Sequence, residues 1–418
     1  MAGLTCAVTL KAAGIDARLL EAGDGPGGRV RTDQVDGFRL DRGFQILLTA
    51  YPEARRLLDY TALDLKRFRS GALIRHESPD TATPWLTLLN PFQEPLSVFQ
   101  TLSSPIGTLA DKLRIVTLLR RTQALGLNDL FRQTPTTTLA LLRELGFSDQ
   151  IIERFFRPFF GGVFLEDALS TSSTFFEFCF RMFFTGDAAL PAQGIGAIPE
   201  QLARRLSPGQ LHYNSPVERI DGDRVYLRNG ESMRSQHIVL AVDAASAARL
   251  LGQAAPTPPA YNHTTCTYLA APADWRLPAG LHRRMLMLNT RRSSAVHNLT
   301  VLTDVAPDLA PAGQHLISVS TQGLETVYEA ALTERILREL GNWFGPSVQT
   351  WRHLRTYHIP QALPAYPPVA PVAGHLHAPL TLREGLYQCG DQTTYPSLNG
   401  AMETGRLVGE QLARLVNR

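Results

Sequence analysis

Two glycine-rich stretches near opposite ends of the chain carry residues that could bind an anionic or electron-rich ligand. In the C-terminal stretch, residues 385–405, the apolar run 386–389 predicts a short buried strand that ends at Gly390 and Asp391. From about residue 397 the spacing becomes helical and stays so to the end of the stretch and beyond. A strand that enters a helix through a glycine-rich turn presents free backbone N–H groups and the positive end of the helix dipole. This stretch therefore predicts a binding site for a negatively charged or electron-rich group.

Small residues follow one face of the predicted C-terminal helix. Ala401, Gly405, Gly409 and Ala413 are spaced four apart and therefore share a face. Such a stripe allows the helix axis to lie close to a sheet or to a bound ring. The alternative is an ordinary helix packed tightly on a core.

The N-terminal stretch has the pattern of a dinucleotide-binding unit. Residues 3–14 predict a helix that stops at Gly14, and residues 17–21 predict a short strand. The strand ends at Glu21, and an acidic residue at the end of the second strand of a dinucleotide fold accepts a hydrogen bond from a ribose 2′-OH.

A second glycine cluster follows directly. Gly27 and Gly28 allow the backbone to approach a phosphate closely, and Arg29 supplies a fixed positive fork. Glu21 and this glycine cluster lie near the N-terminus. Together with the C-terminal stretch, they predict that the two ends of the chain bind one nucleotide cofactor.

These motifs resemble those of the FAD-dependent superfamily that contains flavin amine oxidases, protoporphyrinogen oxidases and the phytoene and carotene desaturases. The matching segments are Glu21-Ala22, Gly27-Gly28-Arg29, Asp41-Arg42-Gly43, Gly390-Asp391 and Ser397 to Gly405. In that superfamily the strand matching Val217 offers its backbone to the adenine ring. The resemblance implies FAD contacts at Gly3, Glu21, Ala22, Gly27, Gly28, Arg29, Val217, Gly390, Asp391, Ser397, Leu398, Gly400 and Ala401. Cys389 is interpreted as a small buried residue, so FAD is expected to be bound non-covalently.

The resemblance also implies an α/β fold with two domains. A discontinuous FAD-binding domain of the Rossmann-like, glutathione-reductase type is expected over residues 1–50, 190–257 and 375–418. A substrate domain with an antiparallel sheet and helices, of α+β type, is expected over residues 51–189 and 258–374. A chain of 418 residues is long enough for two such cores.

The chain departs from the superfamily at its first residues. The fingerprint Gly-x-Gly-x-x-Gly follows a first strand, but this chain opens Met1-Ala2-Gly3, so only the third glycine, Gly3, is present. Because the first strand is central in a doubly wound sheet, its loss is expected to uncover neighbouring strands. We expect that the start was placed too late and that the full enzyme begins upstream. The alternative is a flavin-free binding protein.

Composition excludes several classes of protein. A net charge of +3 provides no basic footprint for nucleic acid. The four cysteines lie far apart without a CxxC pair, which argues against a metal site and a disulfide framework and predicts a reducing, cytoplasmic location. No apolar stretch of about 18 residues predicts a membrane-spanning helix.

Aromatic residues are concentrated in one segment. Eleven of the 19 phenylalanines lie there: Phe155, Phe156, Phe159, Phe160, Phe164, Phe175, Phe176, Phe178, Phe180, Phe183 and Phe184. Two interpretations stay open. In the functional interpretation, the segment forms a hydrophobic tunnel, or a surface that contacts lipid peripherally to collect a small hydrophobic substrate. In the structural interpretation, it forms an aromatic domain core.

The substrate class follows from two differences between this chain and flavin amine oxidases. Amine oxidases of the superfamily usually hold a lysine near the flavin, yet no lysine follows Lys112 here. Many also place a cage tyrosine where this chain has Ser397. The closer similarity is to carotene desaturases, which implies removal of a hydride from a C–H bond of an isoprenoid, with an amine oxidase or a protoporphyrinogen oxidase as the alternative. No catalytic base is marked, and Tyr357 and His358 are candidates by position alone.

Local patterns give further structural expectations. Residues 52–65 predict a helix, and residues 84–95 an apolar loop. The run 211–213 is expected to open a small antiparallel meander that continues through residues 217–234, and residues 237–242 are expected to form a buried parallel strand.

Overall fold

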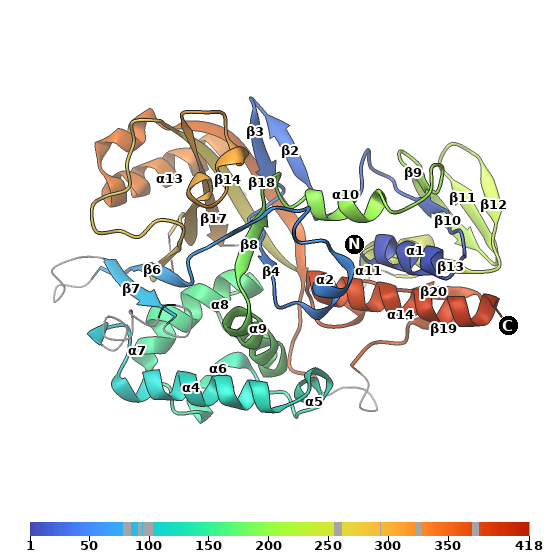
Figure 1. Cartoon of the computed structure of the whole chain (residues 1–418), viewed down its shortest axis with the longest axis horizontal. Coiled ribbons are helices and arrows are strands. Elements are labelled where there is room, and N and C mark those ends of the chain that lie inside the picture. Colours follow the sequence, from blue (N-terminus) through green and yellow to red (C-terminus); the bar gives the residue numbers. More distant parts are fainter. Residues whose placement is uncertain are drawn as a thin grey trace.

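The structure is a computed structural model. It describes residues 1–77, 85–90, 94, 103–254, 261–292, 294–322, 328–369 and 376–417. Figure 1 shows helices α1 and α14 beside short strands at one end, a large sheet with helix α13 at the other, and a helical group, α4 to α9, below them.

The N-terminal helix and a group of short strands form the first region. The helix α1 (Ala2–Ala12) agrees with the prediction, and Gly14 follows it with a φ of 79°. The strands here are β1 (Leu19–Leu20), β9 (Leu211–His212), β13 (Ile238–Leu240), β19 (Thr381–Arg383) and β20 (Leu386–Gln388). The prediction of a parallel strand at β13 is confirmed, since it pairs in parallel with β20.

One strand prediction was wrong in its pairing. The run that includes β9 does not open the antiparallel meander, because β9 pairs in parallel with β1. The meander consists of β10 (Val217–Asp221), β11 (Arg224–Leu227) and β12 (Ser232–Arg234). An alternating or apolar run identifies a strand but contains no information about its partner.

In this region the two parallel pairs, β1 with β9 and β13 with β20, belong to separate sheets among the described residues. One sheet is β1-β9, and the other has the order β13-β20-β19. The beginning of α1 lies against the end of β13, because a Cβ at Gly3 would be 3.0 Å from the Cβ of Ala241. The strands β1 and β13 are each paired on one side only in these sheets.

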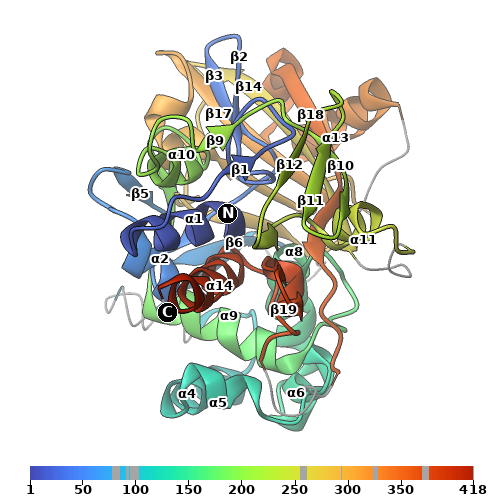
Figure 2. The same ribbon diagram turned by 90° about the vertical axis from the view of Figure 1, so that its right-hand side faces the viewer.

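The small-residue stripe of α14 (Leu398–Val416) packs against α1. A Cβ at Gly405 would lie 2.3 Å from the carbonyl oxygen of Ala2, and one at Gly409 would lie 2.8 Å from the Cβ of Thr9. The two helices lie side by side in both ribbon views (Figures 1 and 2). At Gly405 and Gly409 the stripe therefore makes a close contact with a helix, not with a sheet.

The segment after the second glycine cluster forms a hairpin. The strands β2 (Thr32–Val35) and β3 (Phe38–Asp41) pair across a turn at Asp36 and Gly37. Both turn residues have positive φ, 51° and 83°, which is the geometry that a two-residue hairpin requires.

The largest sheet has seven strands in the order β18-β14-β17-β16-β15-β6-β7. Its neighbours are antiparallel except for β15 and β6, which are parallel. The strands are β6 (Gly71–Arg75), β7 (Trp85–Leu89), β14 (Tyr261–Pro272), β15 (Leu286–Asn289), β16 (Asn298–Val301), β17 (Gln314–Gln322) and β18 (Arg352–Pro364). The prediction of a loop over 84–95 was wrong for residues 85–89, which form β7. The rest of that range lies largely outside the described residues.

Helix α13 (Glu329–Phe344) covers one face of this sheet. Leu332, Ile336 and Leu340 recur at helical spacing, are fully buried, and belong to one apolar cluster with the sheet residues Leu269 and Val319. This packing makes the sheet, of which β18 is an edge strand, a rigid support.

The helical group contains the phenylalanine-rich segment. Its elements are α4 (Leu109–Ala124), α5 (Leu127–Phe131), α6 (Thr138–Glu144), α7 (Asp149–Ile151), a π-helical turn (Ile152–Phe156), α8 (Arg157–Phe164) and α9 (Ser173–Thr185). Helix α4 begins with a capping box, in which Thr108 and Asp111 satisfy each other's backbone N–H groups. Among the described residues, no helix combines the length and the apolar character needed to cross a bilayer.

Shorter elements connect these regions. They are α2 (Pro52–Leu57), β4 (Leu47–Leu48), β5 (Leu65–Arg67), β8 (Ala188–Pro191), α10 (Ala197–Ala203), α11 (Ala244–Leu250) and α12 (Leu302–Val305). Helix α2 is shorter than predicted because the chain leaves it at Leu58, which has extended geometry, and then enters β5. All four cysteines are buried and free. The division into an FAD-binding domain and a substrate domain stays a prediction.

Candidate active site

A single cavity of about 1240 Å³ extends between the two ends of the chain and the helical group. Glu21 from the N-terminal stretch and Asp391 from the C-terminal stretch line it together with Phe160 and Phe183. Residues that are far apart in the sequence therefore share one continuous space.

Most of the predicted cofactor residues line this cavity. They are Glu21, Gly27, Gly28, Arg29, Gly390, Asp391, Ser397, Leu398 and Ala401. Four others do not: Gly3, Ala22, Val217 and Gly400. Gly3 and Gly400 still have a packing role, because a Cβ at Gly400 would lie 2.3 Å from the carbonyl oxygen of Tyr395 and one at Gly3 would touch Ala241. The roles of all these residues toward a cofactor stay predictions.

Arg29 connects three segments at the centre of the cavity. Its Nη2 donates to Asp391 Oδ1 at 2.6 Å, and its Nη1 donates to the carbonyl oxygen of Ala362 in β18 at 2.9 Å. The Asp391 side chain is 8% exposed, whereas that of Arg29 is 39% exposed. The arginine thus links both ends of the chain to the large sheet. Part of its guanidinium stays open to the cavity.

Backbone approaches the cavity at two glycine turns. Gly27 has a φ of 113°, and a Cβ there would lie 2.2 Å from the carbonyl oxygen of Val30. Gly390 has a φ of 150° at the end of β20. Only glycine fits both the geometry and the space at Gly27. These turns place peptide groups against the cavity.

The N-terminus of α14 also faces this space. Ser397 caps it, since its Oγ accepts from the backbone N–H of Gly400 at 2.9 Å, and both Ser397 and Leu398 line the cavity. The positive end of the helix dipole therefore points toward any group bound beside Ser397.

A network of hydrogen bonds holds this helix end in place. Tyr395 donates to Glu403 Oε2 at 2.5 Å and accepts from Asn399 Nδ2 at 2.6 Å, while Asn399 Oδ1 accepts from the backbone N–H of Glu53 at 2.9 Å. Arg406 donates to both carboxylate oxygens of Glu53. Burial raises the pKa of the Tyr395 phenol well above its ordinary value, so this tyrosine stays a hydrogen-bond donor.

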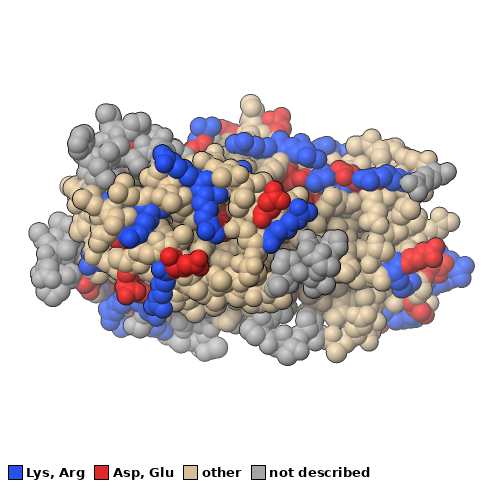
Figure 3. All heavy atoms as spheres, turned by 90° about the horizontal axis from the view of Figure 1, so that it is seen from below, with Lys and Arg blue, Asp and Glu red and all other residues tan. Residues whose placement is uncertain are grey.

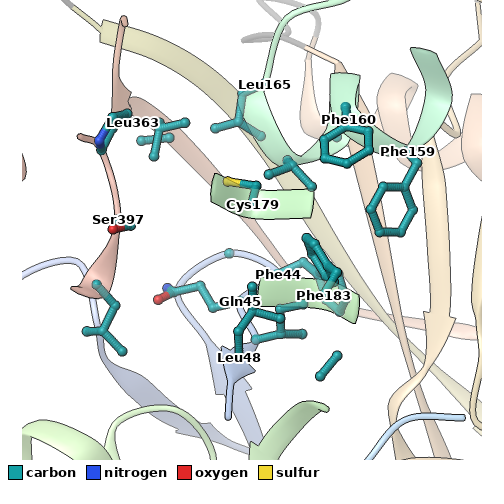
Figure 4. Close-up of a pocket in the computed structure, with 18 of the residues that line it drawn as sticks. Phe44, Gln45, Leu48, Phe159, Phe160, Leu165, Cys179, Phe183, Leu363 and Ser397 are labelled. Carbon is teal, nitrogen blue, oxygen red and sulfur yellow. The ribbon is translucent and has the colours of Figure 1, made fainter. Parts of the chain in front are cut away.

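Beyond Ser397 the cavity widens into an apolar chamber (Figure 4). Its walls come from β18, from helices α8 and α9, and from the segment around β4. Figure 4 shows Leu363 and Ser397 on one side of the chamber and Phe159 and Phe160 on the other, with Leu165, Cys179, Phe44, Gln45, Leu48 and Phe183 between them.

The phenylalanine-rich segment serves both the chamber and the core. Six of its rings line the cavity: Phe155, Phe159, Phe160, Phe175, Phe183 and Phe184. The other five, Phe156, Phe164, Phe176, Phe178 and Phe180, are fully buried in the main apolar cluster. The interpretations as a chamber wall and as an aromatic core therefore each hold for part of the segment.

Sequence comparison decides the family. Residues 1–413 match the profile of the family described as flavin containing amine oxidoreductase. The chain belongs to this family. It is accordingly an FAD-dependent oxidoreductase, and no curated protein sequence matches it significantly.

Solved structures share the fold of this flavin-containing oxidoreductase. A protein assigned as a protoporphyrinogen oxidase of Exiguobacterium sp. 255-15 has a TM-score of 0.70 at 17% identity, covering 99% of this chain and 97% of its own. Cyclohexylamine oxidase of Brevibacterium oxydans IH-35A has a TM-score of 0.69 at 16% identity, covering 100% and 97%. A putrescine oxidase variant has a TM-score of 0.71 at 15% identity, covering 100% and 97%. At these identities the likeness concerns the fold alone.

The residues of the cavity fit FAD. A carboxylate at Glu21, side-chain-free backbone at Gly27 and Gly390, and a cation at Arg29 suit the ribose and diphosphate of a dinucleotide. The capped helix end at Ser397 suits the electron-rich edge of a flavin ring. In this oxidoreductase the cofactor would therefore extend from Glu21 toward the chamber.

Tyr357 and His358, the two candidates for a base, both line the cavity. Tyr357 donates to Asp33 Oδ2 at 2.8 Å, and Arg42 donates to the same carboxylate. Burial, with the hydrogen bond to Asp33, raises the pKa of Tyr357. This tyrosine is therefore held as a donor, which leaves His358, with Nδ1 3.5 Å from Thr265 Oγ1, as the candidate for accepting a proton.

Asp41 belongs to one of the matching motifs, and its side chain holds parts of the fold together. Its Oδ1 accepts from Thr32 Oγ1 at 2.6 Å and from the backbone N–H of Ile195 at 2.9 Å, which fastens the β2–β3 hairpin to the turn before α10. Burial raises the pKa of its carboxyl group to about 6. Asp41 does not line the cavity.

Sequence reasoning missed several chamber residues. Phe44 and Gln45 directly follow a recognised motif, and Leu363 comes a few residues after the base candidates Tyr357 and His358, but none of the three was named as a site residue. The available signal was the direct continuation of Phe44 and Gln45 from Gly43. Nothing in the local pattern distinguished Leu363 or Cys179 from ordinary apolar residues.

Proposed function

We propose that this FAD-dependent oxidoreductase removes a hydride from a C–H bond of a hydrophobic isoprenoid, in the manner of a carotenoid desaturase, and that it binds FAD non-covalently. The observation that carries the proposal is the chamber beyond Ser397, where phenylalanine and leucine side chains supply most of the surface. Such a surface binds an extended hydrocarbon through apolar burial and offers it no specific polar partner.

In this proposal, different residues bind the cofactor and position the substrate. Arg29, Asp391 and the α14 N-terminus hold and orient the cofactor, while the chamber positions the substrate and excludes water. When bound, FAD supplies the redox chemistry, accepting the hydride from the substrate carbon. The proton lost from the adjacent carbon passes to His358 or to water.

The amine oxidase reaction is the weaker alternative for this chain. Ser397 occupies the position of the cage tyrosine, and no lysine follows Lys112 in the sequence. A simple amine would also lose the hydration of its polar group on entering the largely apolar chamber.

A porphyrinogen is the second candidate substrate. Arg69 and Lys112 line the cavity, and cations at these positions suit the carboxylates that such a substrate carries. Arg69 also forms a bidentate pair with Glu94, at 2.8 and 2.6 Å, which partly satisfies its charge.

Anaerobic reduction of the flavin discriminates among these substrates. The purified holoprotein is mixed with a carotene precursor in detergent, with a porphyrinogen, and with a simple primary amine, and the visible flavin absorption is followed. Bleaching by the carotene precursor alone is the expected result. Bleaching by the amine alone would refute the isoprenoid proposal, and bleaching by the porphyrinogen alone would select the second candidate. Acid precipitation is expected to release the flavin into the supernatant, whereas yellow precipitate would contradict non-covalent binding.

A further inference from the structure

The side of the cavity formed by the large sheet contains a buried asparagine. Asn298, the first residue of β16, is 6% exposed and lines the cavity. The next residue, Leu299, belongs to the apolar cluster with helix α13, so Asn298 faces the opposite side of the sheet. On that side its neighbours in β15 are Leu288, with which it pairs, and Leu286, which also lines the cavity. Asn298 therefore places an amide group in an apolar part of the wall.

A neighbouring histidine sets the orientation of this amide. Buried His297 has Nε2 3.4 Å from Asp167 Oδ1 and Nδ1 3.2 Å from Asn298 Nδ2. The contact with Asp167 lacks the alignment of a hydrogen bond, but a carboxylate at this distance favours the neutral tautomer with its proton on Nε2. Nδ1 of that ring is an acceptor, so the amide presents its NH₂ group to His297. Its carbonyl oxygen is turned away.

The amide oxygen is left for a ligand. Among the described residues, Asn298 Oδ1 has no hydrogen-bond partner. It differs in this position from Thr300 Oγ1, which is also unpaired but enclosed by protein, because Asn298 lines the cavity. The backbone of α8 covers the amide nitrogen, since a Cβ at Gly162 would lie 3.1 Å from Asn298 Nδ2. A buried acceptor without a partner costs free energy, and a hydrogen-bond donor on a bound ligand would recover it.

The surroundings favour an uncharged donor. Val163, which follows Gly162 in α8, and Leu286 line the cavity with apolar side chains, so an ammonium group here would lose its hydration. Figure 3, which views the molecule from the side of α4, shows basic and acidic side chains beside one another on a mostly uncharged surface. That face of the described surface gives a charged ligand little electrostatic advantage. A hydroxyl group is a neutral donor that an otherwise apolar molecule can carry.

We propose that Asn298 binds a hydroxyl group of the substrate, which is then an isoprenoid alcohol and not a pure hydrocarbon. The hydroxyl donates to Asn298 Oδ1, and His297 is a positioning residue that keeps this oxygen toward the cavity. The phenylalanine and leucine side chains of the chamber hold the rest of the molecule by apolar burial. The isoprenoid class rests on the proposed function; the hydroxyl site does not, since it depends only on the cavity wall.

Calorimetric titration of the holoprotein tests the site. The flavin is first reduced with dithionite so that no ligand can be oxidised. Geranylgeraniol, the corresponding aldehyde and the hydrocarbon of the same skeleton are then titrated in one detergent. The alcohol is expected to bind at least about threefold more tightly than the aldehyde, which has no donor for Asn298 Oδ1. Equal affinity for these two ligands would overturn the proposal.

Substitutions test the location. Asn298→Leu is expected to weaken alcohol binding about fivefold to tenfold and to leave hydrocarbon binding within about twofold. The matched control is Thr300→Val, on the same face of β16 and outside the cavity lining, which should leave both affinities within about twofold. If the leucine variant does not retain flavin, Asn298→Ala replaces it, because it adds no atoms against Gly162. An unchanged affinity for the alcohol, or equal weakening for alcohol and hydrocarbon, would overturn the proposal.

His297→Leu tests the positioning role. It frees the amide to turn, so the preference for alcohol over aldehyde is expected to fall to within about twofold, whereas a merely structural role would weaken all three ligands alike. Alcohol binding that depends on Asn298, without flavin reduction by any isoprenoid, would keep the hydroxyl site and reject the proposed function. Flavin reduction by the carotene precursor, without an effect of Asn298→Leu on any ligand, would keep the proposed function and reject the hydroxyl site.

Discussion

Replacement of Arg29 by alanine is expected to weaken both the apoprotein and its affinity for FAD. The change removes the hydrogen bonds to Asp391 and to the carbonyl oxygen of Ala362. A hydrogen bond between charged groups contributes about 1.5–3 kcal/mol, and because the Arg29 side chain is 39% exposed, the loss in the free energy of unfolding is expected at the lower end, about 1.5 kcal/mol. Urea denaturation of the flavin-free protein measures it.

The effect on FAD follows from the part of Arg29 that faces the cavity. Loss of one charge-assisted hydrogen bond to the diphosphate would reduce FAD affinity by roughly tenfold to a hundredfold. Fluorescence titration of flavin into the apoprotein measures the dissociation constant. Arg29→Lys is the matched control, because it keeps the charge and loses the planar fork, and an intermediate affinity is expected.

A double-mutant cycle with Asp391→Asn isolates the contact between the two side chains. Because their atoms lie 2.6 Å apart, a coupling energy of about 1 kcal/mol is expected in the apoprotein. Additive effects of the two substitutions, together with an FAD affinity in Arg29→Ala within about twofold of the unchanged protein, would refute the assignment of Arg29 to the cofactor site.

Four other substitutions test the packing, the electrostatics and the chamber. Gly405→Leu is expected to lower the free energy of unfolding by more than about 2 kcal/mol in urea denaturation, because the Cβ position lies 2.3 Å from the Ala2 carbonyl oxygen; an unchanged midpoint would contradict the close helix contact. For Asp41, the folded pKa of about 6 lies above the ordinary 3.8, so the folded state binds more protons and its stability falls as pH rises from about 4 to 6, by up to about 3 kcal/mol. Asp41→Asn is expected to remove this decline in denaturation curves recorded across that range, and an unaltered slope would argue against it. Phe183→Ala, in the chamber wall, should raise KM for an apolar substrate several-fold with a modest loss of stability, whereas Phe180→Ala, fully buried in the core, should cost about 3–5 kcal/mol of stability; equal stability losses would contradict this division of the rings.

The sequence identified the local elements that hold the cofactor-facing residues. Glycine turns and helix ends have strong local signals, which is why the helix stop at Gly14 and the helix start near residue 397 were predicted correctly. Asp391 and Glu21 were placed at strand ends for the same reason.

Pairing and packing partners could not be read in this way. The strand at Leu211 was recognised, but its partner β1 lies almost the whole first half of the chain away. The stripe at Gly405 predicted a close approach without revealing that α1 is the neighbour. The chamber was incompletely predicted because Leu363 and Cys179 acquire their role only from the assembled fold, since an apolar side chain has the same local pattern in a core and in a cavity wall.

The π-helical turn at 152–156 has a consequence for the shape of the chamber. A π-turn contains one residue more than the corresponding stretch of α-helix, and each residue of an α-helix rotates the following side chains by about 100°. Phe159 and Phe160 come directly after this turn and face the chamber. Deletion of a single residue here would rotate both rings away from the substrate and leave the composition of α8 intact. Homologues could therefore differ in the shape of the substrate they accept through the rotation of one helix about its axis, without exchanging any aromatic side chain.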